Sequence, residues 1–291
     1  MEIKANFTLN YLINPANRGY FIMESGTLKH LYDQLKNNWH FFPNSKVRDL
    51  TKIDLNNNYS LIVAVDSDGG IGNLEGDTVK CDPYQLGRFA MRVPLMEILS
   101  SGALPIAAFD MLTIPMKGPG EEIVHGVRDE LARAGLGKDF PLSGSTEDNV
   151  PTVMTGIGTT IIGIVHENDF RPGSAQNGDI IICIGVPKSA PEDRVLLDDI
   201  DIINQNDIIE LLKIPEAHDI LPVGSRGVSY EAGEMARSAG LNISQYDNPK
   251  IDVEKSAGPS TCAIISCSQS IKNKLQEIIH VPISLIGELE L

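Results

Sequence analysis

The chain has 291 residues, a formal net charge of −15 and a hydrophobic content of 42%. This length is sufficient for two domains with sizeable cores, and the composition is that of a globular protein. The acidic balance argues against a nucleic-acid partner, because the phosphate backbone is bound by clustered Lys and Arg side chains.

Neither a secretory signal nor a membrane span is expected. The N-terminal residues lack a basic-then-apolar pattern, and no run approaches the ~20 apolar residues that cross a membrane. The four cysteines have no metal-ligand spacing, and three of them lie in apolar runs. We therefore expect reduced core cysteines in a cytoplasmic protein. Residues 1–47 hold the only tryptophan, Trp39, and an aromatic pair at 41–42, and this segment is expected to pack on the core.

The stretch from Ser60 to Gly76 carries the strongest indication of chemistry. Its apolar residues 61–65 are typical of a buried strand. Asp66 and Asp68 follow, and because residues two apart in an extended chain point the same way, both carboxylates face one spot. Three glycines come next, at Gly69, Gly70 and Gly72. Because they have no side chain, their backbone can approach a ligand closely and direct N–H groups toward phosphate oxygens. The pattern indicates a Mg²⁺ and phosphate site, with an acidic, glycine-rich turn as the alternative.

A helix is expected from Asp82, which is a suitable N-cap before Pro83. Its apolar stripe consists of Leu86, Phe89, Ala90 and Val93. Pro94 is expected to kink this helix. Glu97 lies on the apolar face at helical spacing, where a carboxylate must be paired, protonated or bound to a metal. The alternative is that the kink turns Glu97 out to solvent.

The rest of the first half alternates strand and helix. The segment 106–114 is expected to be a strand that carries Asp110, and a helix is expected from Gly120 to Gly135. Residues 143–151 form a loop of small hydroxyl and acidic residues before a long strand. Further phosphate or metal ligands in this loop are Ser145, Thr146, Glu147 and Asp148, although a capping or turn role fits equally well.

The second half is expected to be a separate domain. Residues 169–179 have the Pro, Gly and polar composition of a linker, and strands and helices alternate again beyond it. The segment 218–227 reads as a strand, a glycine turn and a helix start. There, Ser225 and Arg226 lie between Gly224 and Gly227, which favours an anion pocket at a helix N-terminus. A tight turn with a solvent-facing arginine is the alternative.

The order of these segments resembles the PurM-like ATP-binding superfamily. The motifs that carry the resemblance are D-x-D-G-G-I-G, then E-I-L-S-S-G-A-L-P, then F-D, then S-G-S-T-E-D-N-V-P, and they lie within residues 48–290. This superfamily includes aminoimidazole ribonucleotide synthetase, thiamine-monophosphate kinase, selenophosphate synthetase and the hydrogenase maturation factor HypE. The resemblance implies a homodimer with a barrel formed by paired N-terminal sheets, and ATP and Mg²⁺ held by acidic N-terminal loops.

Individual positions carry over from the resemblance. Asp66 looks like the strand-end metal-binding aspartate, Glu97 stands where the family usually has aspartate, and Asp110 matches an acidic strand residue. The G-G-[DE]-T loop is matched at Gly144 and Thr146. The loop departs from the family pattern at two serines, so that the acidic ligand expected at position 145 is absent and either Glu147 or Asp148 would replace it. Lys80 is the nearest candidate for the family's phosphate-contacting lysine, and the segment 218–227 is similar to D-I-T-x-G-G-G.

Among the subgroups, the set D-S-D-G-G-I-G, G-S-T-E and P-V-G-S-R-G looks most like the α-ribazole kinases of cobamide lower-ligand salvage. The resemblance therefore implies an α/β (α+β) protein with an N-terminal segment at 1–47, an ATP-binding domain at 48–168 and a smaller domain at 169–291. It would be an ATP- and Mg²⁺-dependent kinase of a small ribosyl-type alcohol, a chemistry that needs positioned phosphates rather than a protein nucleophile. Asp68 or Asp110 could accept the acceptor's proton.

Two alternatives remain open at this point. One is an ATP-dependent synthetase, either an amide-activating ring closure or a selenophosphate synthetase type of reaction. The other is a nucleotide-binding protein that has lost catalysis. The altered G-G-[DE]-T loop is the feature that supports this alternative. The predicted metal ligands are Asp66, Asp68, Glu97 and Glu147.

Overall fold

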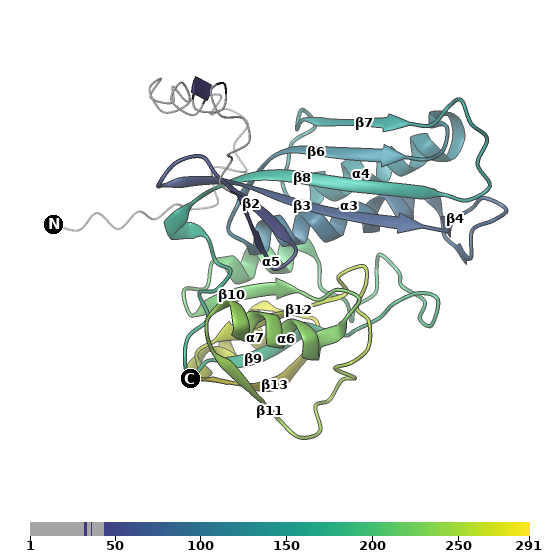
Figure 1. Cartoon of the computed structure of the whole chain (residues 1–291). Helices are drawn as coiled ribbons and strands as arrows, with labels where there is room; N and C mark the ends of the chain where they lie inside the picture. Colours follow the sequence, from purple (N-terminus) through teal and green to yellow (C-terminus); the bar gives the residue numbers. More distant parts are fainter. Residues whose placement is uncertain (1–31, 34–35, 37–43) are drawn as a thin grey trace.

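The computed structural model describes residues 32–33, 36 and 44–291, apart from the side chains of 272 and 273. The expectation that Trp39 and its aromatic neighbours pack on the core lies outside these residues. Two sheets, one in each half of the chain, are stacked with helices around them (Figure 1). The predicted mixed α/β fold class is confirmed. Within the described residues, no helix is long and apolar enough to cross a membrane.

The first half forms a six-stranded sheet in the order β1-β2-β3-β8-β6-β7. All neighbouring strands are antiparallel except β6 and β7. The strands are β1 (Asn44–Val47), β2 (Leu50–Asp54), β3 (Tyr59–Gly69), β6 (Leu104–Leu112), β7 (Leu142–Thr146) and β8 (Gly156–His166). One face of the sheet is covered by α3 (Pro83–Ser100) and α4 (Glu121–Arg133), and the short strands β4 (Ile71–Gly72) and β5 (Val79–Lys80) precede α3 (Figure 1).

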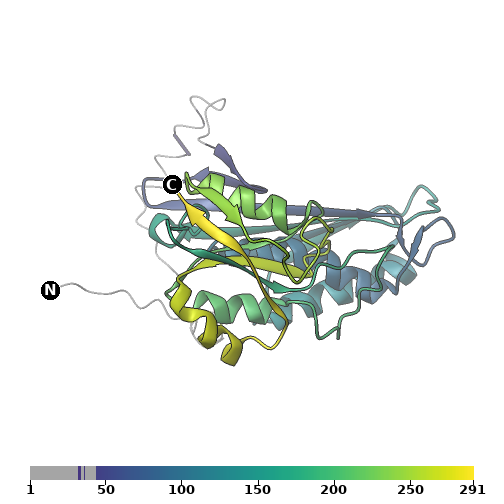
Figure 2. The ribbon, with the colours of Figure 1, turned by 90° about the horizontal axis from the view of Figure 1, so that it is seen from below.

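The second half forms a five-stranded antiparallel sheet in the order β10-β12-β9-β13-β11. Its strands are β9 (Ile180–Gly185), β10 (Ala217–Pro222), β11 (Asn242–Gln245), β12 (Cys262–Cys267) and β13 (Ile283–Glu290). Figure 2 shows α6 (Gly227–Ser238) on one side of this sheet and α5 (Gln205–Leu212) and α7 (Lys272–Ile278) on the other. Every residue of β9 is buried, as expected for a central strand covered on both faces.

The two halves share one hydrophobic core rather than touching through a thin linker. Buried residues of α3, such as Leu95, belong to the same cluster as Ile208 of α5 and Ile220 of β10. The contact is also polar, because Arg92 of α3 donates from Nη2 to the Ile203 carbonyl at 2.7 Å. The expected boundary at 169–179 therefore separates two sheets that are packed firmly together, and the division into separate domains stays a prediction.

The helix α3 continues through Pro94 to Ser100, as expected, and the predicted kink stays a prediction. Two other features differ from the expectations. The segment 143–146, expected to be loop, is the edge strand β7, because it takes up hydrogen bonds beside β6 in parallel register. The hairpin of β1 and β2, with its turn at 48–49, was not expected, and the boundary placed at 48 falls inside that turn. All four cysteines are free, and three are buried, as predicted.

Two glycines let α3 and α4 cross at close range. A Cβ at Gly87 of α3 would lie 2.0 Å from the carbonyl oxygen of Ile123, and one at Gly126 of α4 would lie 2.1 Å from that of Tyr84. Each helix thus presents a bare glycine to the backbone of the other. This contact fixes α3 against the sheet, and the residues described below depend on that position.

Gly126→Ala tests the close crossing. Alanine is the better helix former, but its Cβ would overlap a backbone carbonyl that cannot move away, so we expect the free energy of unfolding to fall by about 1–3 kcal/mol. Gly233→Ala is the matched control, since Gly233 also lies inside a helix but has open space at its Cβ position. It should raise stability by about 0.5–1 kcal/mol. Urea denaturation of both variants measures the difference, and equal effects would contradict the close crossing.

Candidate functional site

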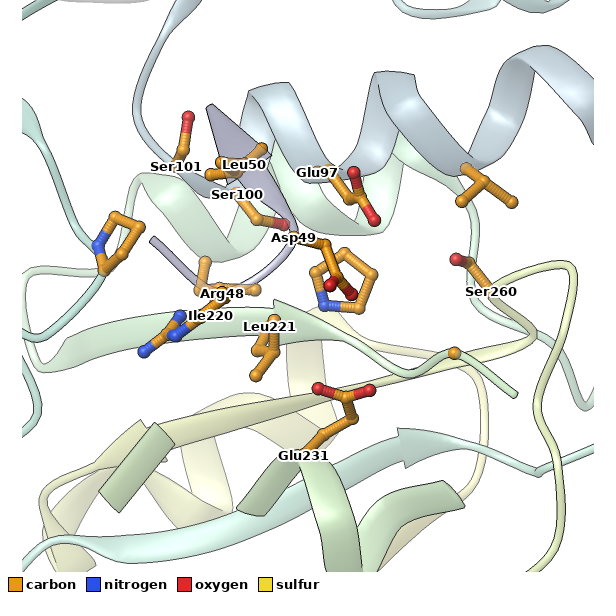
Figure 3. Close-up of a pocket in the computed structure, with 14 residues that line it drawn as sticks. Arg48, Asp49, Leu50, Glu97, Ser100, Ser101, Ile220, Leu221, Glu231 and Ser260 are labelled. Carbon is orange, nitrogen blue, oxygen red and sulfur yellow. The ribbon is translucent and has the colours of Figure 1, made fainter. Parts of the chain in front are cut away.

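A small cavity lies between the two halves of the chain (Figure 3). Its volume is about 40 Å³, and its walls come from the β1–β2 turn, α3, the end of β10 and α6. A space of this size holds an ion with a few waters but is too small for a nucleotide. Its lining includes Asp49, Glu97, Ser100 and Glu231.

The β1–β2 turn is held in the second half by an ion pair. Arg48 adopts a positive φ of 56°, and its guanidinium donates to both carboxylate oxygens of Asp219, with Nη1–Oδ1 at 3.0 Å. It also donates to Ser238 Oγ, and Asp219 accepts from the Gly173 N–H at 3.0 Å. Arg48 is thereby fully engaged with Asp219. The same turn brings the next residue, Asp49, to the cavity.

Three carboxylates point into the cavity from three different elements. Figure 3 shows Glu97 descending from α3, Asp49 reaching in from the turn, and Glu231 rising from α6. Burial raises the pKa of Glu97 well above its usual value, and the neighbouring Asp49, Asp66 and Glu231 raise it further. Burial, followed by Asp49, raises the pKa of Glu231 to about 7. The cavity therefore favours a bound cation or a proton.

Two buried oxygen atoms at this cavity have no partner within the described residues. They are Oε2 of Glu97 and the hydroxyl Oγ of Ser100, whose side chain is almost completely buried. A buried polar atom without a hydrogen bond costs roughly 1–3 kcal/mol. Both atoms belong to residues that line the same space, so a ligand placed there would satisfy them together.

The acidic set continues along β3. Ser60, Ile62 and Ala64 are buried against the helices, and Asp66 and Asp68 continue this alternating series on the same face. Burial raises the pKa of Asp66, and it raises that of Asp68 to about 6 with a contribution from Asp66. The predicted residues Asp66, Asp68 and Glu97 thus belong to one electrostatically linked series, which Asp49 and Glu231 extend.

The donor chemistry of this series fits Mg²⁺. No group of three His, Cys, Asp or Glu side chains within 44–291 is close enough, as it stands, to enclose a metal. Mg²⁺ does not need such a group, since it keeps several waters and takes one or two carboxylates together with substrate phosphates. Glu97, with its unpartnered oxygen, and Asp49 provide two such carboxylates.

Glu147 lies apart from this series. Its Oε1 accepts the backbone N–H groups of Asn149 and Val150 at 2.7 and 3.0 Å, so it stabilises its own loop. Thr146 likewise donates to Asp148 at 2.7 Å. In this loop the turn role, which was the alternative to metal binding, is the one that the structure shows.

Asp110 is separated from the other carboxylates by α3. Asp66 and Asp110 lie in one row of the sheet, on either side of Thr159. The Thr159 hydroxyl donates to the Ala90 carbonyl of α3 at 2.8 Å, so the helix passes over the strand between the two aspartates. Asp110 instead lines a second hollow with the predicted phosphate-binding residues Gly144, Ser145 and Thr146.

The first glycine loop is largely occupied by its own hydrogen bonds. The Gly70 N–H donates to the Thr155 carbonyl at 2.8 Å, and Gly72 is buried. Lys80 donates from Nζ to the carbonyls of Leu74 and Glu75, at 2.6 and 3.3 Å, which closes the β4–β5 connection. Gly69 is exposed at the end of β3. A phosphate role for Gly69, Gly70, Gly72 and Lys80 stays a prediction.

The second glycine turn borders the carboxylate cavity. Gly224 lines it, and its N–H bonds to Glu231. Ser225 and Arg226 are exposed, and the Arg226 guanidinium stacks on the Tyr230 ring with its central carbon 3.8 Å from the ring centre. Gly227, at a φ of 82°, begins α6. The turn is thus next to the site, while its arginine faces solvent as the alternative reading held.

Sequence reasoning missed Arg48, Asp49 and Glu231. Glu231 follows Val228 by three residues and therefore lies on the apolar stripe of its helix, the same signal that identified Glu97. No comparable signal marks Asp49, because its partners are reached only through long-range packing. Arg48 and Asp219 are 171 positions apart in the chain.

Comparison with known proteins agrees with this architecture. Residues 48–165 match the family "AIR synthase related protein, N-terminal domain". A selenide, water dikinase from Caldanaerobacter subterraneus subsp. tengcongensis is 28% identical over 195 residues. That alignment covers 60% of this chain and 54% of the relative, so the chain spans about half the length of the curated relative it matches.

Solved structures of low sequence identity share the fold. Thiamine monophosphate kinase from Aquifex aeolicus has a TM-score of 0.59 at 16% identity, over 90% of this chain and 94% of that one. The hydrogenase maturation protein HypE from E. coli has a TM-score of 0.59 at 17% identity, over 79% and 80%. The family match thus covers the first half of the chain, and the shared fold extends over both halves.

Proposed function

We propose that this protein is an ATP- and Mg²⁺-dependent small-molecule kinase, and that its acceptor is α-ribazole. The observation that carries the proposal is the series of carboxylates from Asp68 to Glu231. Its members Asp49, Glu97 and Glu231 line the cavity between the two halves and make no ion pair with any residue that the structure describes. Phosphoryl transfer uses such carboxylates to hold Mg²⁺ against nucleotide phosphates. The acceptor follows from the resemblance of the loop motifs.

The relatives support nucleotide use. One is named for a dikinase reaction, a ThiL structure contains AMPPCP and TMP, and a HypE structure contains ATP. Each of these proteins is divergent from this chain, so their ligands indicate a class of reaction rather than a particular acceptor. A kinase is the simplest reaction that agrees with them and with the carboxylate series.

The residues of the series take different roles in this proposal. Asp49 and Glu97 hold Mg²⁺, which when bound neutralises phosphate charge. Asp68 lies at the outer end of the series, and its pKa of about 6 suits a group that accepts the proton of an acceptor hydroxyl near neutral pH. Glu231 supplies a carboxylate from the second half of the chain, and in this way links binding to the relative position of the halves.

The uncovered face of the first sheet supports the proposed homodimer. Large apolar side chains on this face are 42–59% exposed, namely Tyr59, Val65, Leu104, Ile106 and Met111. A contiguous apolar sheet face of this kind marks a protein interface. The barrel of paired N-terminal sheets that the resemblance implies would cover it.

The kinase proposal predicts transfer of label from γ-labelled ATP to one acceptor of a panel. The panel contains α-ribazole, thiamine phosphate, selenide and formylglycinamidine ribonucleotide, and we expect label on α-ribazole only when Mg²⁺ is present. Phosphate release only with the amidine substrate would instead support ring closure. Nucleotide binding without turnover on any acceptor would support a non-catalytic protein.

Glu97→Gln tests the metal site within that assay. Loss of one carboxylate next to the metal should lower kcat/KM by about 100-fold or more, while the melting temperature does not fall. Glu210→Gln is the matched control, because Glu210 is an exposed helix residue whose ion pair among the described residues is with Lys213 on the surface. A Glu97→Gln enzyme with wild-type kinetics would show that the site lies elsewhere.

The carboxylate cavity also predicts a pH dependence of stability. A carboxyl whose pKa is about 7 when folded, against an ordinary 4.5, holds more protons in the folded than in the unfolded state between these pH values. The free energy of unfolding should therefore fall as the pH rises from about 5 to 8, by about 1–3 kcal/mol for this group. Glu231→Gln should reduce that fall, as measured by urea denaturation at both pH values. An identical slope in the variant would contradict the arrangement.

The dimer is tested by a charge on the uncovered sheet face. Val65→Glu places a carboxylate on the apolar face and should shift the protein from dimer to monomer in size-exclusion chromatography with light scattering. Val150→Glu is the control, because Val150 is also 59% exposed but lies on a loop outside the sheet. A monomeric wild type, or a dimer that survives Val65→Glu, would contradict the interface.

A further inference from the structure

A second hollow lies on the other side of α3 from the carboxylate cavity. It is bounded by β6, β7 and α4 and has a volume of about 210 Å³. Drug-sized ligands occupy pockets of about 300–1,000 Å³, so this hollow suits a molecule of a few heavy atoms rather than a nucleotide. The side chains that face it determine which kind of small molecule it takes.

Strand alternation decides which side chains of β7 face the hollow. Leu142, Gly144 and Thr146 point to the face that α4 covers, whereas the two serines between them point to the opposite face. The Thr146 hydroxyl donates to Asp148 at 2.7 Å. On this side the hollow therefore meets an apolar side chain, a bare glycine and a hydroxyl that is already bonded, which is a poor match to a sugar or another polyol.

The opposite wall comes from α4 and the segment before it. Val124 and Arg128 are one turn apart, and both line the hollow from the same side of the helix. Val124 and Leu142 both pack against the hydrophobic core, and Met116 lines the same space. The middle of the hollow is thus apolar, and its charged side chains, Asp110 and Arg128, stand at its two ends.

Asp110 forms the inner end. Only 4% of this residue is exposed, and its carboxylate has no hydrogen-bond partner among the residues that the structure describes. Gly144 lies directly beside it and leaves room for the carboxylate, since a Cβ there would lie 2.3 Å from Asp110 Oδ1. A buried carboxylate without a partner is unfavourable. A protonated amine both donates hydrogen bonds to such a group and neutralises its charge.

Arg128 forms the outer end. It is exposed, and among the described residues its guanidinium makes neither a hydrogen bond nor an ion pair. Burial raises the pKa of Asp110, and the nearby Arg128 opposes that shift. The two opposite charges are therefore close enough to interact, yet they face the same hollow without meeting. A guanidinium is well matched to the oxygens of an acidic group.

A ligand that satisfies both ends carries an amine, a short apolar body and an acidic group. Arg128 is the one cation among the residues that line the hollow. One positive charge balances a carboxylate, whereas a phosphate ester carries nearly two negative charges. We propose that this hollow binds a small aliphatic amino acid as its zwitterion, with the ammonium group on Asp110 and the carboxylate toward Arg128.

Isothermal titration calorimetry of the full chain, without ATP or Mg²⁺, tests the proposal. The probes are alanine, β-alanine and 4-aminobutyrate, in which the two charges lie progressively further apart, and butylamine and butyrate, which carry one charge each. We expect the best of the three amino acids to bind about tenfold or more tightly than either single-charge probe, because only a zwitterion engages both ends.

Absence of binding by all three amino acids, a smaller preference over the single-charge probes, or tighter binding of 2-aminoethyl phosphate would overturn the proposal. Because the titration contains no nucleotide, it succeeds or fails independently of the kinase assay.

Variants at the two ends separate ligand binding from folding. Arg128→Gln should lower the affinity for the best amino acid about tenfold, to that of butylamine, while butylamine itself binds no more weakly because a positive charge has been removed. The near-isosteric Asp110→Asn should weaken the amine and the amino acid alike. Arg133→Gln is the matched control, since Arg133 is an exposed arginine in the last turn of the same helix. Equal amino-acid affinity in wild type and Arg128→Gln, with unchanged melting temperatures, would overturn the assignment.

Discussion

The ion pair between Arg48 and Asp219 is the interaction on which the carboxylate cavity depends. It fastens the β1–β2 turn to the second sheet and brings Asp49 toward Glu97 and Glu231. At the same time it consumes the arginine that would otherwise neutralise them. Burial of several carboxylates without a cation is unfavourable for folding. A fold that retains such an arrangement has its acidic groups available for a ligand, and this distinguishes the cavity from an ordinary polar contact between two sheets.

The position of α3 explains why the acidic residues of the first half are divided between the carboxylate cavity and the second hollow. The helix crosses the sheet above β8, where the Thr159 hydroxyl binds its backbone. Asp66 then lies on one side of the helix and Asp110 on the other. The close crossing with α4 through Gly87 and Gly126 keeps the helix in this position. One rigid element thus separates the carboxylate cavity from the hollow under α4, and a ligand in one does not share ligating groups with the other.

Local sequence signals predicted the elements and part of the site. The Asp82–Pro83 start of α3, the alternation along β3 and the helical spacing of Glu97 all depend on neighbours within a few residues, and the structure agrees with them. The helix continues past Pro94 to Ser100, as the sequence predicted, and the kink expected at Pro94 stays a prediction. β7 was expected to be loop because its small, polar residues are typical of turns, whereas its hydrogen bonds come from β6. Asp49 became part of the site only through a contact that spans 171 positions, which no local pattern records.

The size of the cavity limits how a nucleotide would reach the carboxylates. At about 40 Å³ it has no room for a triphosphate, so the phosphates would approach from the end of the series that lies outside it. Asp68 and Asp66 form that end, near the exposed Gly69. A metal held by Glu97 and Asp49 would then lie at the inner limit of the phosphate chain, with Glu231 contributed by the second half. In the proposed arrangement, Asp66 and Asp68 would lie nearest the nucleotide. Its metal would be held by Glu97, which the sequence predicted, and by Asp49, which only the structure brings to the site.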